Sequence, residues 1–179
     1  MRSKFIIRTP IQSTMNYPIL LTMIFSLFSN FLSADELKIG ATAPQVMTTD
    51  HTGQAVDLGK ELSSGTVLVF FYPKAMTPGC TKQACSLRDG WDLLQAREVK
   101  IFGVSSDTAA SQQEFRDKYE LPFTLLADTN QKVADAFGKG RWSRQAYIFQ
   151  DGKLVWSDLK AATSKQAEEV LAALDALGK

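Results

Sequence analysis

Residues 66–89 read TVLVFFYPKAMTPGCTKQACSLRD, and this stretch joins two kinds of local structure. It begins with a continuous run of β-branched, leucine and aromatic residues that stops at Pro73, which is typical of a strand buried on both faces. Thr77 and Pro78 then match an N-cap followed by proline at the first helical position. The stretch therefore predicts a buried strand, a short loop, and a helix that begins at Pro78 and runs toward Ala96.

Further apolar runs predict four more strands along the chain. Three of them lie at residues 99–104, 123–126 and 146–149. Asp151 and Gly152 have the composition of a hairpin turn, which predicts an antiparallel partner strand at residues 153–156.

Helical patterns separate these strands. Ser111-x-x-Glu114 and Thr163-x-x-Gln166 match capping boxes and predict two helix starts. The second of these helices has one apolar face, expected to pack on the sheet, which carries Ala167, Val170, Leu171, Leu174 and Leu177. Strands that alternate with helices and end in one hairpin predict an α/β protein of the thioredoxin-like fold, with a mixed central sheet flanked by helices.

The composition limits the number of domains and the class of partner. The chain has 179 residues, and at roughly 150 residues per domain this length allows one domain. Hydrophobic residues make up 45% and charged residues 22%, as in ordinary globular proteins, which excludes a disordered or disulfide-dense scaffold. The net charge is +1 without any basic run, so nucleic acid is not an expected partner.

Residues 1–34 have the order of a secretory signal peptide. Their charged residues are all basic (Arg2, Lys4 and Arg8), and an apolar run over residues 19–32 is followed by Ser33 and Ala34. We predict cleavage after Ala34, a domain over residues 35–179, and export to the periplasm or an organelle lumen. The run of about 14 residues is shorter than the roughly 20 of a membrane-spanning helix. An uncleaved anchor and an organelle transit peptide are the alternatives.

The leader changes the meaning of the net charge. Without its three basic residues, residues 35–179 carry 17 basic and 19 acidic residues, a net charge of −2. The domain that we expect to function is therefore slightly acidic.

Cys80 and Cys85 are the two cysteines of the chain. Cys80 falls in the first turn of the predicted helix, where N–H groups without acceptors and the helix dipole favour a thiolate. Residues five apart in a helix lie about 140° apart around the axis and about 8.7 Å apart between Cα atoms. A disulfide needs Cα atoms within roughly 7 Å. The two cysteines can therefore join only if the first turn unwinds.

Other uses of these cysteines are less well supported. A permanent bridge conflicts with the helix geometry, and inert core thiols are not expected beside a Thr-Pro-Gly helix start. Two thiols and His51 do not make a four-ligand zinc set. The Thr-Thr-Asp-His-Thr-Gly setting favours a surface-loop position for His51 over a role as a general base.

Pro73-x-x-x-Thr77-x-x-Cys80 resembles the active-site motif of the peroxiredoxins. The wider stretch over residues 71–89 resembles the peroxiredoxin Q group, also called bacterioferritin comigratory protein, and the likeness extends over residues 36–177. The resemblance implies a thioredoxin-like fold, a peroxidatic Cys80 and a resolving Cys85. It also implies a conserved arginine before the strand that leads to the Asp-Gly turn, for which Arg144 is the first candidate and Arg141 the second. Gln83 departs from the pattern, because many peroxiredoxins have glutamate there.

This resemblance implies a thiol-dependent peroxidase for hydrogen peroxide and organic hydroperoxides. Cys80 would form a sulfenic acid, Cys85 would convert it to an intramolecular disulfide, and a thioredoxin-like dithiol would reduce that disulfide. Thr77 would orient the peroxide, Pro73 would shield the site from water, and Arg144 would stabilise negative charge. We expect no metal or organic cofactor, no stable membrane association after cleavage, and a monomer or weak dimer. A non-enzymatic thioredoxin-like redox sensor or binding module is the alternative.

Overall fold

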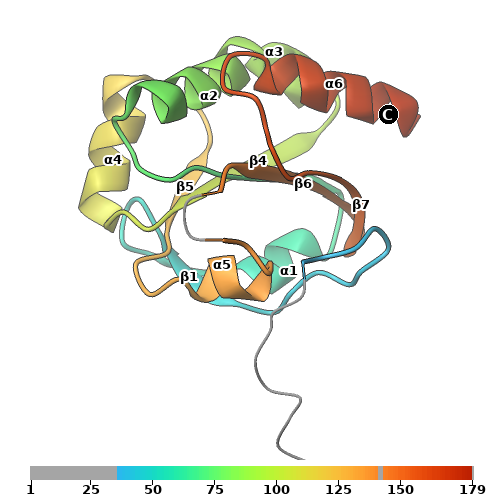
Figure 1. Cartoon of the computed structure of the whole chain (residues 1–179), viewed down its shortest axis with the longest axis horizontal. Coiled ribbons are helices and arrows are strands. Elements are labelled where there is room, and N and C mark those ends of the chain that lie inside the picture. The colour runs from blue at the N-terminus through green and yellow to red at the C-terminus, as the bar shows by residue number, and fades with distance from the viewer. Residues whose placement is uncertain (1–35, 141–142, 179) are drawn as a thin grey trace, which may run out of the picture. The chain divides into compact units, whose positions relative to one another are not determined.

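Figure 1 shows the computed structural model of the chain, which describes residues 36–140 and 143–178. All of these residues belong to one compact unit. The predicted leader, residues 1–34, and Arg141 lie outside the described residues. In the described ranges, no helix combines the length and the apolar character needed to cross a membrane.

The centre of the unit is a seven-stranded sheet in the order β2-β1-β5-β4-β3-β6-β7. β3 pairs in parallel with β4, and β4 with β5, whereas every other neighbouring pair is antiparallel. The predicted mixed sheet is therefore confirmed, as is the β6–β7 hairpin that turns at Asp151 and Gly152. The strands are β1 (Met47–Asp50), β2 (Ala55–Asp57), β3 (Thr66–Phe71), β4 (Val99–Ser105), β5 (Thr124–Ala127), β6 (Gln145–Gln150) and β7 (Lys153–Asp158).

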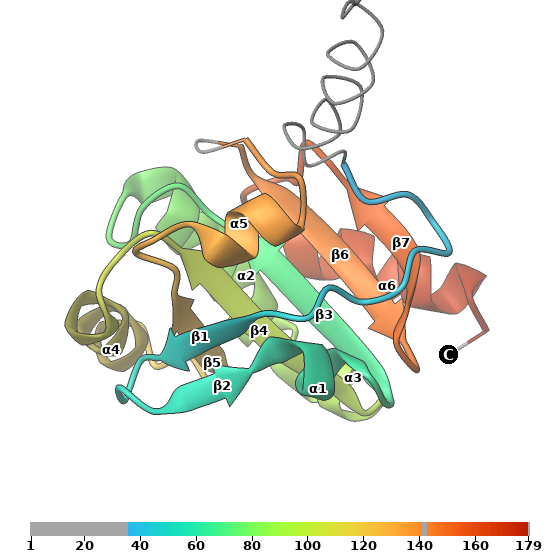
Figure 2. The same ribbon diagram turned by 90° about the horizontal axis from the view of Figure 1, so that it is seen from below.

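Helices cover both faces of the sheet. α2, α3, α4 and α6 lie on one face, and α1 and α5 lie on the other (Figures 1 and 2). Their bounds are α1 (Leu58–Leu62), α2 (Pro78–Asp89), α3 (Trp91–Gln95), α4 (Ala109–Lys118), α5 (Lys132–Ala136) and α6 (Gln166–Ala176).

β3 is buried on both faces, as its sequence predicts. Successive side chains of a strand point to opposite faces, so β3 contributes to both core clusters. Leu68 and Phe70 pack with residues of α2 and α6, whereas Val67 and Val69 pack with residues of α1 and α5. All four are at most 1% exposed.

The predicted single helix from Pro78 toward Ala96 is wrong, because the chain breaks at Gly90 into α2 and α3. A Cβ atom on Gly90 would lie 2.7 Å from the Cβ of Ala167, which belongs to α6. Glycine therefore allows α6 to approach the junction of the two helices, a contact that local sequence does not reveal.

The predicted start of α4 is also displaced. Its N-cap is Thr108, whose Oγ1 accepts a 3.2 Å hydrogen bond from the N–H of Ser111. Ser111 thus lies inside the helix that it was expected to cap. Thr108 supplies the same chemistry three residues earlier.

The start of α6 differs from its prediction for a tertiary reason. The helix begins at Gln166, not after a cap at Thr163. The N–H of Ala167 donates to Oγ of Ser86 in α2 at 3.1 Å, so a neighbouring helix supplies the acceptor. The apolar stripe packs on the sheet side as predicted except for Leu177, which follows the helix and is exposed.

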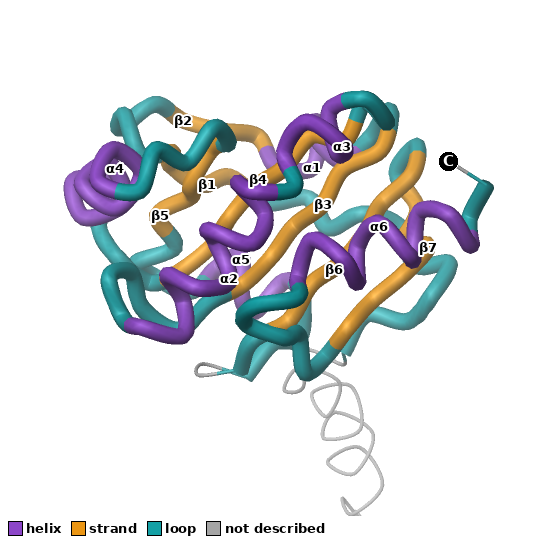
Figure 3. The backbone as a smooth tube through the Cα atoms, turned by 90° about the horizontal axis from the view of Figure 1, so that it is seen from above, coloured by secondary structure: helices purple, strands orange, loops and turns teal. Residues whose placement is uncertain are grey.

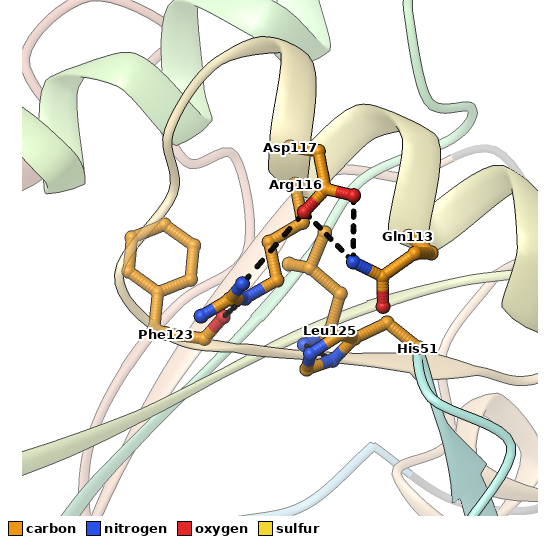
Figure 4. A network of polar contacts seen from close by, with 6 residues as sticks. All are labelled: His51, Gln113, Arg116, Asp117, Phe123 and Leu125. Carbon is orange, nitrogen blue, oxygen red and sulfur yellow. Dashed lines mark hydrogen bonds and ion pairs between the residues drawn. The ribbon is translucent and has the colours of Figure 1, made fainter.

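Sequence patterns missed the short elements β1, β2, α1 and α5. His51 lies in the turn between β1 and β2, as expected, and is half-buried. Nδ1 of the His51 ring accepts a hydrogen bond from the backbone N–H of Leu125 at 3.3 Å (Figure 4). The backbone N–H of His51 donates to the Leu125 carbonyl at 2.8 Å. His51 therefore ties this turn to β5.

Candidate active site

Cys80 lies in the first turn of α2, which starts after the loop that follows β3. Thr77 is the N-cap with an extended backbone and Pro78 is the first helical residue. Cys80 is 1% exposed and belongs to the core cluster on the α2 face of the sheet, together with Tyr72 and Ala75. The expectation that the Thr-Pro-Gly helix start keeps Cys80 out of the core is therefore wrong, because the first turn of α2 packs its sulfur against the sheet side. The sulfur is thus held at the start of a helix and against the core.

The Thr77 hydroxyl does not cap the helix, although the sequence predicts that it does. Its Oγ1 donates instead to the carbonyl of Lys74 at 2.9 Å. The first backbone bond of the helix runs from the N–H of Thr81 to the Thr77 carbonyl at 2.9 Å. The N–H groups of Gly79 and Cys80 precede that bond, so they have no acceptor within the helix. This end of α2 consequently favours a negatively charged group next to the sulfur.

The structure brings Arg144 to Cys80. Arg144 precedes β6, and its Nη2 lies 3.5 Å from Sγ of Cys80. Its Nη1 donates to Oε1 of Gln83 at 2.5 Å. A Cβ atom on Gly79 would lie 3.2 Å from Nη2 of Arg144, so the absence of a side chain there leaves room for the guanidinium. The guanidinium is thus placed where it can stabilise negative charge that develops during a reaction at this sulfur.

Two buried glutamines, Gln83 and Gln166, extend the hydrogen bonding from Arg144 to the start of α6. Nε2 of Gln83 donates to Oε1 of Gln166 at 2.8 Å, and both side chains have no exposed surface. Sequence reasoning noticed Gln83 but assigned Gln166 only to a capping box. No local pattern places the start of α6 at this site.

A second, partly buried network holds the loop before Cys80. The N–H of Ala75 and Oγ of Ser105 both donate to Oδ2 of Asp107, each at 2.7 Å. Nε2 of Gln112 donates to Oγ of Ser105 at 2.9 Å, and the Tyr72 hydroxyl donates to Oε1 of Gln112. Burial raises the pKa of Tyr72 above its ordinary value, which keeps the hydroxyl protonated as a donor.

Pro73 is half-buried at the beginning of the same loop. It borders a groove of about 340 Å³ together with Lys74, Ser106, Asp107, Thr108 and Ser111. Pro73 therefore lines this groove where the loop toward Cys80 begins.

Cys85 is on the same helix in a different environment. Both cysteines are free, and Cys85 is half-buried, whereas Cys80 is buried. Partial burial raises the pKa of the Cys85 thiol, with Arg88 acting in the opposite direction and Asp89 in the same direction. The structure thus separates a buried sulfur beside Arg144 from a half-buried sulfur whose pKa is raised by burial.

The amino-acid sequence of this chain is similar to one protein family and to named members of it. The sequence model of the AhpC/TSA family matches residues 39–157. Peroxiredoxin Q, chloroplastic, of Oryza sativa subsp. japonica is 40% identical over 133 residues, which cover 70% of this chain and 60% of the rice protein. The match therefore spans less than two thirds of the rice protein. Peroxiredoxin Bcp of Escherichia coli K12 is 42% identical over 112 residues, which cover 63% of this chain and 70% of the relative.

Solved structures agree with these matches. Peroxidoxin BcpB of Mycobacterium tuberculosis superposes with a TM-score of 0.73 at 32% identity, covering 79% of this chain and 99% of that one. The bacterioferritin comigratory protein of Xanthomonas campestris, studied for alkyl peroxide reduction, gives a TM-score of 0.71 at 25% identity, covering 80% and 98%. The predicted thioredoxin-like fold is confirmed.

Proposed function

Because the chain belongs to the AhpC/TSA family, and within it to the peroxiredoxin Q (Bcp) group, we propose that it is a thiol-dependent peroxidase. Its substrates are hydrogen peroxide and organic hydroperoxides. The observation that carries this proposal is the 3.5 Å contact between Nη2 of Arg144 and Sγ of Cys80 at the start of α2.

The first step is nucleophilic attack by the Cys80 thiolate on one oxygen of the peroxide. An S–O bond forms as the O–O bond breaks, and the departing oxygen takes a proton and leaves as water or an alcohol. Cys80 becomes a sulfenic acid. Arg144 and the free N–H groups of Gly79 and Cys80 stabilise the negative charge that develops on the oxygens.

Two further residues assist this step. The Thr77 hydroxyl keeps unused lone pairs while it donates to Lys74, so its oxygen is able to accept the peroxide O–H and orient the substrate. Pro73 contributes a side chain without polar atoms at the beginning of the loop, which reduces contact between the site and water.

The second step joins the two cysteines. The Cys85 sulfur attacks the sulfenic sulfur of Cys80, an S–S bond forms and water leaves. The first turn of α2 must unwind for this reaction, since an intact helix keeps residues five apart too far from each other. A thioredoxin-like dithiol then reduces the disulfide and becomes a disulfide itself.

A peroxide assay on the full chain tests the proposal. With thioredoxin, its reductase and NADPH present, the wild-type protein should consume hydrogen peroxide catalytically, and Cys80→Ser should not. Cys85→Ser should form one sulfenic acid per chain, but thioredoxin should no longer recycle it efficiently. Intact mass analysis of the oxidised wild type should show the loss of two hydrogens. Turnover by Cys80→Ser would contradict the mechanism.

The redox-sensor alternative is tested by the same assay. Arg144 against Cys80 is an arrangement for peroxide reduction, and a sensor that only signals to a partner does not require catalytic turnover. Oxidation of the wild type without repeated turnover would favour the sensor.

We further propose that residues 1–34 direct export, on the basis of their basic start, apolar run and Ser33-Ala34 ending. An exported enzyme requires a dithiol donor in its own compartment. Cell fractionation followed by N-terminal sequencing tests this proposal, with Asp35 expected as the first residue of the exported protein. An intact leader on membrane-bound protein would indicate an anchor instead.

A further inference from the structure

Three side chains form a hydrogen-bond chain that leads away from Cys80. Arg144 contacts the sulfur through Nη2 and donates to Oε1 of Gln83 through Nη1. Gln83 in turn donates through Nε2 to Oε1 of Gln166, at the first position of α6. The start of α6 is thus linked to the reacting sulfur by two hydrogen bonds and one sulfur contact.

The chemistry of Arg144 fixes which amide atoms of Gln83 and Gln166 donate and which accept in this series of hydrogen bonds. A guanidinium has only donors, so Gln83 must turn its carbonyl oxygen toward Arg144. Its amide nitrogen then faces Gln166, which must present its own carbonyl oxygen. A flip of Gln83 would place two donors opposite each other and remove the acceptor that holds Nη1 of Arg144.

This arrangement leaves one polar atom without a partner. Nε2 of Gln166 is buried and makes no hydrogen bond within the described part of the chain. Buried amide donors without acceptors are unfavourable and rare, and an apolar side chain at this position would avoid one. Gln166 supplies an acceptor oxygen to Gln83, which an apolar residue at this position could not do.

The position of Gln166 is well defined by its surroundings. α6 and α2 lie side by side over the sheet (Figure 3). The N–H of Ala167 donates to Oγ of Ser86, and Ala167 packs against Gly90. These contacts fix the start of α6 relative to α2 independently of the glutamine pair.

We propose that Gln166 is a positioning residue of the peroxidase site, which acts through Gln83 to hold Arg144 against Cys80. The proposal rests on the proposed function and adds a residue of the C-terminal helix to it. Among the hydrogen bonds of the described residues, Gln166 bonds to Gln83 and not to Cys80 or Arg144. Its acceptor oxygen selects the one orientation of the Gln83 amide that anchors the guanidinium.

The test measures the second-order rate constant for oxidation of Cys80 by hydrogen peroxide in the full chain. Gln166→Met keeps the length of the side chain and removes the acceptor, and we expect the rate constant to fall about tenfold. Gln166→Glu keeps an acceptor oxygen in the same place, and we expect it to retain at least half of the wild-type rate. The kcat/KM for thioredoxin should stay within twofold of wild type in both variants.

Two comparisons separate positioning from packing. Ser86→Ala removes the other side-chain hydrogen bond between α2 and α6, and should change the peroxide rate constant by less than about twofold. Gln83→Met should slow oxidation at least as much as Gln166→Met, and the double variant should be no slower than Gln83→Met alone. Non-additivity of this kind is expected when one residue acts entirely through the other.

Several results would overturn the inference. They are an unchanged rate in Gln166→Met, an equal loss in Ser86→Ala, the same loss in Gln166→Glu as in Gln166→Met, or additive losses in the double variant. If the wild-type protein itself does not react with peroxide, the proposed function fails and this inference fails with it. Normal wild-type oxidation with no effect at Gln166 rejects the inference alone.

Discussion

The backbone N–H of Ala75 donates a 2.7 Å hydrogen bond to Oδ2 of Asp107, 32 residues away in the sequence. This bond ties the loop that leads to Cys80 to the segment that follows β4. The loop contains Met76 with a φ of 62°, a left-handed conformation that is unfavourable for a side chain of this kind. Tertiary contacts such as the one to Asp107 therefore hold the loop in a conformation that its own sequence disfavours.

Asp107→Ala should weaken both the fold and the site. It leaves the Ala75 N–H without its acceptor, which costs about 1–3 kcal/mol for a buried group. We expect a loss of that size in the free energy of unfolding measured in urea, and slower oxidation of Cys80. Asp107→Asn keeps an acceptor oxygen and should lose less than Asp107→Ala in both measurements. Equal losses in the two variants would show that the carboxylate charge, not the acceptor, is what matters.

Tyr72→Phe should destabilise the protein through Gln112. The substitution removes the hydroxyl that donates to Oε1 of Gln112, which is completely buried. A buried acceptor without a donor costs about 1–3 kcal/mol. Urea denaturation should show a loss in this range, whereas Tyr119→Phe at the half-buried end of α4 should change the free energy of unfolding by less than about 0.5 kcal/mol. Equal stability of Tyr72→Phe and wild type would refute the importance of this hydrogen bond.

Gly79→Ala should separate activity from stability. The added Cβ would lie 3.2 Å from Nη2 of Arg144 and displace the guanidinium by a few tenths of an ångström. Catalytic geometry is sensitive to such shifts, and we expect oxidation of Cys80 to slow about tenfold. Alanine is also favoured over glycine in helices by up to about 1 kcal/mol, so the free energy of unfolding should not fall. Lys82→Ala, at an exposed position of α2, is the control and should change neither quantity substantially.

Cys85 should titrate above the ordinary range of a thiol in the folded protein. Burial disfavours the charged thiolate and raises the pKa of Cys85, so a smaller fraction is thiolate at any given pH. In Cys80→Ser, the rate of alkylation by iodoacetamide should therefore reach its midpoint at a higher pH in the folded protein than in urea, where thiols titrate near 8.5. A midpoint at or below the value in urea would contradict the assignment.

The sequence by itself determined the parts of this protein that depend on neighbouring residues. The β-branched and aromatic run before Pro73 predicts β3, because such a run is stable only when both faces of the strand are covered. Thr77 and Pro78 predict the start of α2, because the fixed φ and missing N–H of proline suit the first position of a helix. Together they place Cys80 in the first turn, where its reactivity is favoured.

The resemblance to the peroxiredoxins named Arg144 for the site, but only the tertiary structure showed its contact with Cys80 and the side chains that hold it there. Arg144 is 64 residues from Cys80, and Gln166 is 83 residues from Gln83, so neither contact follows from local spacing. The same holds for the contact at Gly90, between α2 and α3, where the absence of a side chain leaves room for Ala167 of α6. Helix and strand patterns record local propensity and periodicity, whereas these contacts arise because the sheet brings β3, β6 and α6 together. The position of the proposed reactive thiol is thus encoded locally, and the side chains proposed to hold Arg144 beside it are brought there by the fold.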